Sequence, residues 1–214
     1  MNIERLNESV KGRRKYDSPA RREQAEATRR QIADAARRTF IEHGWAGTRV
    51  RDVAAEAGVS EATVFAIHGN KAGLARSLLD TVDAGADVPR LMSDLKAAEG
   101  DPAAQLAAWV TFDRRLFERG YDLIVMMREA QRSEPDIDAA YQEGRRRGRE
   151  GQSKMFSSWP ADALREGMTP ERASDIFAGL CNVDVYRVLT QERDWTPDQV
   201  EEWWREALTA LLLR

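Results

Sequence analysis

The chain has 214 residues, of which 42% are hydrophobic and 32% are charged, and these proportions are ordinary for a soluble globular protein. Cys181 is the only cysteine, which excludes an internal disulfide and a multi-cysteine zinc site. The longest apolar run near an end, residues 207–213, is far shorter than the roughly 20 residues of a membrane span, and the N-terminus lacks the apolar core of a signal peptide. We therefore expect a protein of a reducing cytoplasm, with no membrane partner.

Charge is divided unevenly along the chain. Residues 1–76 hold 15 Lys or Arg and 10 Asp or Glu, whereas residues 77–214 hold 18 and 26. A basic first part on an acidic body favours contact between that first part and a polyanion. Chance clustering is the alternative explanation.

Residues 1–21 are expected to form a flexible arm, because they contain Ser, Gly and Pro beside the basic cluster Lys11–Lys15. The stretch that follows, up to His43, has no Gly or Pro. Its apolar residues, such as Ile32, Ala36 and Phe40, recur at helical spacing. This pattern predicts one long helix that ends at Gly44.

Two short helices are predicted next. Thr48 is expected to cap the first, and Gly58 is expected to end it as a residue with positive φ. Ser60 is expected to cap the second, with Val59 and Val64 placed as a hydrophobic staple across its start. A tight turn that contains Gly58 therefore joins the two short helices.

The second short helix should end near His68, where Gly69 breaks it, and Asn70 should cap a fourth helix that runs to about Val82. The remaining chain shows no strand-like alternation. Four prolines follow Asp, Glu or Thr, as is typical of the first position of a helix: Pro102, Pro135, Pro170 and Pro197. The sequence predicts an all-α protein of about ten helices.

The two short helices, joined by a tight glycine turn and packed on a long helix, are typical of a helix-turn-helix. In that motif the first helix holds the second at an angle that fits the DNA major groove. A generic corner between two helices is the alternative.

The residues from Phe40 to Leu74 closely resemble the DNA-binding domain of TetR-family transcriptional regulators. The similarity includes the helix end at Gly44, the turn from Val53 to Ser60, Thr63-Val64 and the helix start at Asn70-Lys71. It is strong over about residues 22–80 and extends weakly to the end of the chain. The resemblance implies a helix-turn-helix DNA-binding domain over 22–82 and an effector-binding and dimerisation domain over 83–214.

Carried over by position, the resemblance implies a DNA-contacting set: Thr48, Arg49, Arg51, Ser60, Glu61, Ala62, Thr63, Phe65, Ile67 and Lys71. Thr48, Thr63 and Lys71 would contact the DNA backbone and so position the protein, and Arg51 would reach a base edge. Capping, packing or a solvated charge are the alternative roles.

The recognition helix departs from the family pattern in one respect. The segment Phe65-Ala66-Ile67-His68 stands where the family carries hydroxyl-bearing aromatic residues. We therefore expect few direct contacts between this helix and the bases. Arg49 and the basic arm are candidates for compensating contacts with phosphate or the minor groove.

Two further sets follow from the resemblance in the C-terminal half. The expected effector pocket is lined by Trp109, Phe112, Leu116, Met126, Met127, Tyr141, Met155 and Trp159, which would suit an apolar molecule. The expected four-helix dimer interface uses Ile176, Phe177, Leu180, Val183, Val200, Trp204, Leu208 and Leu211. A core within the single chain is the alternative for both sets.

These features together indicate a homodimeric repressor that binds a palindromic operator in double-stranded DNA and responds to a small molecule. No cofactor, metal ligand set or catalytic residue is expected, since both histidines, His43 and His68, fall in the helix-turn-helix region. The alternatives are a DNA-coating protein of low sequence specificity and, more remotely, a helical-bundle enzyme.

Overall fold

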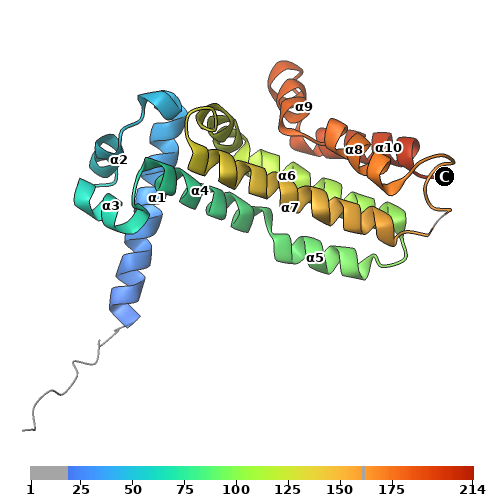
Figure 1. Ribbon diagram of the computed structural model, residues 1–214, viewed down its shortest axis with the longest axis horizontal. Helices are drawn as coiled ribbons and strands as arrows, with labels where there is room; N and C mark the ends of the chain where they lie inside the picture. Colours follow the sequence, from blue (N-terminus) through green and yellow to red (C-terminus); the bar gives the residue numbers. More distant parts are fainter. Residues whose placement is uncertain (1–18, 161) are drawn as a thin grey trace, which may run out of the picture.

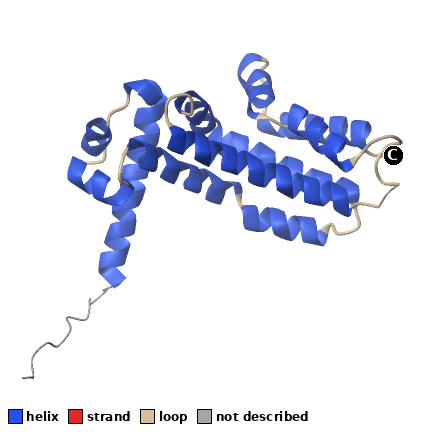
Figure 2. Cartoon of the chain, viewed as in Figure 1, coloured by secondary structure: helices blue, strands red, loops and turns tan. Residues whose placement is uncertain are grey.

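The computed structural model describes residues 19–160 and 162–214, and within these ranges the chain forms helices and no sheet (Figure 2). The predicted arm therefore lies outside the described residues as far as Ser18. The helices are α1 (Pro19–Gly47), α2 (Val50–Glu56), α3 (Glu61–His68), α4 (Lys71–Ala86), α5 (Val88–Ala97), α6 (Pro102–Ala130), α7 (Pro135–Ser158), α8 (Pro170–Leu180), α9 (Val183–Arg187), the π-helical turn η1 (Val188–Glu192) and α10 (Pro197–Leu212). The all-α prediction is confirmed.

The long helices α6 and α7 lie side by side and form the axis of the molecule (Figure 1). Helices α1 to α4 gather at one end of this pair, with α2 and α3 outermost. Helix α5 packs along one side of α6, and α8, α9 and α10 lie along the opposite side (Figure 1). The short helices α2 and α3 are therefore far from α8 and α10.

Four helices begin at the prolines that the sequence indicated, because the N–H that proline lacks would be unbonded at a helix start. Asp101, Thr169 and Thr196 precede three of them, and each side chain accepts a hydrogen bond from a backbone N–H of the first turn. Thr196 also forms a reciprocal capping box with Gln199. Local sequence thus sets where these helices start.

Two apolar cores hold the fold together. The first joins α1 to α4 with the end of α6 and the start of α7, through residues such as Leu123, Met127 and Ile137. The second fills the space between α5, α6, α7, α8, α9 and α10. Helix α4 runs continuously across residues 82 and 83, the predicted domain boundary, so the N-terminal helices are fixed directly on α6.

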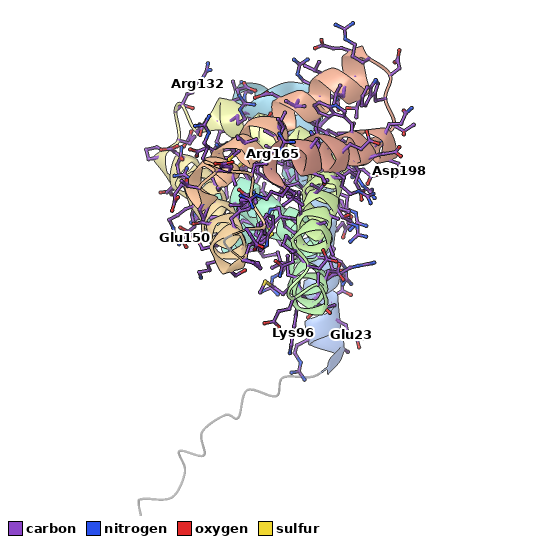
Figure 3. The ribbon with its side chains drawn as sticks, turned by 90° about the vertical axis from the view of Figure 1, so that its right-hand side faces the viewer. Glu23, Lys96, Arg132, Glu150, Arg165 and Asp198 are labelled. Carbon is purple, nitrogen blue, oxygen red and sulfur yellow. The ribbon has the colours of Figure 1, made fainter. Side chains whose placement is uncertain are left out.

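Charged side chains surround these cores. Figure 3, which views the molecule from the end far from α2 and α3, shows Lys96 of α5, Glu150 of α7 and Asp198 of α10 pointing outward. Within the described ranges no helix is both long and apolar enough to cross a membrane.

Candidate nucleic-acid interface

The turn between α2 and α3 has the geometry that the sequence predicted. Gly58 has φ 64°, a left-handed conformation that glycine adopts without steric cost, and Gly69 ends α3 with φ 76°. The Ser60 hydroxyl accepts a hydrogen bond from the Thr63 N–H at 3.1 Å and lies 2.9 Å from the Thr63 hydroxyl. Asn70 caps α4, since its side chain accepts a bond from the Gly73 N–H at 2.7 Å.

The prediction that Thr48 caps α2 is wrong. Arg49 occupies the N-cap position and its side chain makes no capping bond. The Thr48 side chain is buried, and its hydroxyl donates to the carbonyls of Thr39 (3.1 Å) and Gly44 (2.8 Å). Gly44 interrupts the helical conformation near the end of α1 with φ 67° and ψ −179°, and Thr48 bonds to its carbonyl and to that of Thr39 in the preceding turns. The Thr48 hydroxyl therefore ties down the end of α1 and does not reach the surface.

Lys71 is also engaged within its own chain. Its Nζ donates a hydrogen bond to the carbonyl of Trp45 and lies 4.2 Å from the centroid of the Trp45 ring. Trp45 in turn stacks on Phe40, with ring centroids 5.5 Å apart. Burial lowers the pKa of Lys71, and the nearby carboxylates Glu134 and Glu129 oppose this shift. Lys71 thereby fixes the start of α4 against the end of α1.

The outward face of α3 is small and largely apolar. The Phe65 side chain is 46% exposed, and Glu61, Ala62 and Ala66 are exposed beside it. Ile67 instead packs half-buried against the first core. The predicted DNA residues that share the exposed surface of α2 and α3 are Arg49, Arg51, Ser60, Glu61, Ala62 and Phe65, whereas Thr63, Ile67 and Lys71 are half-buried.

His68, the last residue of α3, faces inward. Its Nε2 is buried and finds no hydrogen-bond partner among the described residues. Burial and the positive charge of Arg29 on α1 both lower the pKa of the imidazole. A neutral ring therefore packs at the end of α3.

Two arginines of α1 tie the N-terminal helices together and to α6. Arg37 donates to both carboxylate oxygens of Asp122, with Nη2 at 2.8 and 2.9 Å, and to the Arg119 carbonyl at 2.6 Å. Arg38 pairs with Glu56 of α2 at 2.9 Å. Sequence reasoning missed the Arg37–Asp122 pair, because its members lie 85 residues apart and neither shows a local pattern.

The expected effector residues divide between the two cores. Met126 and Met127 belong to the first, with Tyr141 packed against it, and Trp109, Met155 and Trp159 belong to the second, with Phe112 packed against it. Leu116 packs against both. A surface depression of about 510 Å³ lies between α5 and α6, lined by alanines and by Arg90, Asp94, Thr111 and Arg115, and none of the expected residues lines it.

Most of the expected dimer residues are buried inside the single subunit. Phe177, Val200, Trp204 and Leu208 have no exposed surface, and Val183 is buried in the same core. These five side chains pack within the subunit, in the core that α6 shares with its neighbours, and the dimer interface itself stays a prediction. Leu211 is 46% exposed, and Ile176 and Leu180 are half-buried.

The described residues contain no group of three His, Cys, Asp or Glu side chains placed to hold a metal ion. No curated protein matches the sequence closely enough to count as a relative. Residues 32–78 match the family described as bacterial regulatory proteins, tetR family. This match spans α2, α3, the first half of α4 and the part of α1 that packs on them.

Solved structures share the fold over most of both chains. A protein of Saccharomonospora viridis, described as a transcriptional regulator in complex with choline, is 18% identical with TM-score 0.72, and the similarity covers 88% of this chain and 99% of that one. NalD of Pseudomonas aeruginosa, the secondary repressor of the MexAB-OprM multidrug efflux pump, is 23% identical with TM-score 0.69, covering 89% and 98%. FadR of Bacillus subtilis, solved with stearoyl-CoA, is 19% identical with TM-score 0.66, covering 84% and 96%. The helix-turn-helix part of the chain, residues 32–78, therefore matches the tetR family of bacterial regulatory proteins, and the chain as a whole shares the fold of these solved structures.

Proposed function

We propose that this protein is a homodimeric repressor that binds a palindromic operator and releases it when a small molecule binds the C-terminal helices. The observation that carries this proposal is the exposed face of α3, with Ala62 and Phe65 outward, at the outermost end of the molecule (Figure 1). A short helix held by a cap and two left-handed glycines, with its outer face unpacked, suits insertion into the major groove.

The similar structures support the class of mechanism. NalD is a repressor, and the Saccharomonospora viridis and Bacillus subtilis proteins were solved with choline and stearoyl-CoA. Here a ligand among α6 to α10 would act on the DNA-binding helices through α6, since α1 and α4 pack on it and Arg37 bonds to Asp122. In one conformation of the dimer, the two DNA-binding domains would no longer match successive major grooves. A ligand that binds this conformation more tightly lowers DNA affinity by the difference between its binding free energies for the two conformations.

A DNA-binding protein of low sequence specificity is the second candidate, favoured by the composition of α3. Among its residues only Glu61 carries a formal charge, and no side chain of the exposed face can form the bidentate bonds that distinguish bases. Selection from a random duplex library separates the two functions. An inverted repeat supports the repressor, whereas retention of duplexes without a consensus supports the second candidate.

Arg51→Ala is expected to weaken binding to the selected duplex by about 1–3 kcal/mol, and to relax the sequence preference at one position. Arg90→Ala is the matched control, because both arginines are similarly exposed (60% and 58%) and each faces a neighbouring Asp. Fluorescence anisotropy at constant salt measures both affinities. Equal affinities for the two variants would remove Arg51 from the interface.

Leu211→Glu is expected to weaken dimerisation by about tenfold or more, because a carboxylate would be buried where α10 meets the partner subunit. Met92→Glu is the control, since Met92 is exposed on α5, on the other side of the molecule. Sedimentation equilibrium measures both dissociation constants. A Leu211→Glu variant that dimerises like the control would place the interface elsewhere.

A further inference from the structure

The middle of α6 carries a carboxyl group inside the second core. Asp113 is 7% exposed, and none of the described residues offers it a hydrogen bond or an ion pair. Its neighbours on the same face of α6 are apolar, including Val110 and Phe117. A buried polar group without a partner lowers stability, so a buried Asp in this position calls for a role other than folding.

Aromatic rings from three helices meet one turn away from this carboxyl group. The ring centroids of Phe117 on α6, Tyr186 on α9 and Trp204 on α10 are 5.9, 6.1 and 6.2 Å apart in pairs. The Trp204 Nε1 is buried and has no hydrogen-bond partner in the described part of the chain. The core at this point therefore holds π faces, an unpaired carboxyl group and an unpaired indole N–H.

We propose that Asp113 and the rings of Phe117, Tyr186 and Trp204 form the effector site, and that the effector is an organic cation with an apolar body, such as a quaternary ammonium. The carboxylate supplies the opposite charge, and the ring faces attract a cation by their quadrupoles. A neutral apolar effector would gain nothing from Asp113, and an anion would be repelled by it. This inference rests on the proposed function and replaces the purely apolar effector that the sequence indicated.

The ionisation of Asp113 agrees with such a site. Burial raises the pKa of the carboxyl group well above its usual range, because desolvation disfavours the charged form. Burial and the Asp113 charge likewise raise the pKa of the Cys181 thiol. A bound cation would restore the carboxylate by pairing with it, as an opposite charge does in any buried pair.

A ligand can enter the cluster only if one of the rings moves. The Tyr186 ring is the candidate, because it lies on α9, the helix with the weakest attachment to the rest of the fold. Helix α9 has five residues and is followed by the π-helical turn η1, a distortion that is frequent at functional sites. Its ion pair to α6, between Asp184 and Arg128, is solvent-exposed and contributes little. Displacement of α9 would open the ring cluster without disturbing α6 or α10.

The test compares phenyltrimethylammonium with its uncharged isostere tert-butylbenzene, using the full-length protein. Titration followed by tryptophan fluorescence should give an affinity for the cation about tenfold or more above that for the isostere. Asp113→Asn, which preserves size, should abolish this preference and leave the affinity for tert-butylbenzene within about twofold. Asp175→Asn, at an exposed position on α8, should bind both compounds like the wild type.

Equal binding of the two compounds by the wild type, or an unchanged cation preference in Asp113→Asn, would overturn the proposal. Thermal unfolding of each variant shows that it is folded. Binding that depends on Asp113 but does not release DNA would keep the site and reject the ligand-responsive repressor.

Discussion

Gly73→Ala is expected to reduce DNA affinity about a hundredfold and to lower the free energy of unfolding by several kcal/mol, at the upper end of the range for overpacking. A Cβ on Gly73 would lie 2.0 Å from the His68 carbonyl oxygen and 3.2 Å from its carbon. Both are backbone atoms, and the carbonyl already accepts a hydrogen bond from the Asn70 N–H at 2.9 Å. Relief of the clash must therefore move the end of α3 relative to α4, and with it the exposed face of α3.

Gly144→Ala is the matched control for this substitution. Gly144 lies in the interior of α7, and a Cβ there would meet no atom within 4 Å. The variant should leave DNA affinity unchanged and raise stability by about 0.5–1 kcal/mol, the helix preference of alanine over glycine. Urea unfolding and anisotropy with the selected duplex measure both effects. Wild-type DNA affinity in Gly73→Ala would show that the end of α3 can shift freely, contrary to the observed packing.

Arg114→Leu is expected to lower the free energy of unfolding by about 3–5 kcal/mol, because it leaves a buried carboxylate without its main partner. Glu201 of α10 is buried, and it accepts hydrogen bonds from Arg114 at 2.7 Å, Thr111 at 2.6 Å and Arg205 at 2.9 Å. Arg114 also bonds to Glu118 on its own helix. The cluster joins α6 to α10, the helix that carries Leu211.

The double variant Arg114→Leu/Glu201→Leu should recover most of the lost stability, because it removes both buried charges together. Burial by itself would raise the pKa of Glu201, but the hydrogen bonds from Thr111 and Arg114 and the charges of Arg114 and Arg205 outweigh it and leave the pKa below its usual value. The cluster thus stabilises the fold above the unfolded-state pKa, about 4.3, and this contribution is lost as the pH falls through the lower folded-state pKa. Urea unfolding at pH 7 and between pH 5 and pH 3 should show a steeper acid loss in the wild type than in the double variant. A double variant no more stable than Arg114→Leu would contradict this account.

The sequence by itself determined the local structure of the helix-turn-helix region. The Ser60 and Asn70 caps and the positive φ of Gly58 and Gly69 depend on side chains and residues within a few positions of each other. The same holds for the four proline-started helices. These interactions form wherever the local pattern occurs, so the pattern is enough to predict them.

Sequence reasoning assigned side chains to surfaces less well, because burial depends on segments far apart in the chain. Thr48 and Lys71 were expected at the DNA, yet both bond to backbone carbonyls at the end of α1. Phe177, Val200, Trp204 and Leu208 form an apolar stripe that fits an interface between subunits as well as a core within one. Only the packing of α8 and α10 on α6 and α7 decided for the core.

For Asp113, part of the environment can be predicted from the sequence and part depends on the tertiary structure. Its place among Trp109, Val110 and Phe117, at helical spacing, marked it in the sequence as a charged residue on an apolar face, and that signal could have been used. The sequence could not show that no donor approaches it or that the rings of Tyr186 and Trp204 converge nearby. Those facts depend on how α9 and α10, some 70 to 90 residues further along the chain, return to pack on α6. Helix starts and ends follow from neighbours in the sequence, whereas the environment of a buried charge is decided by tertiary contacts alone.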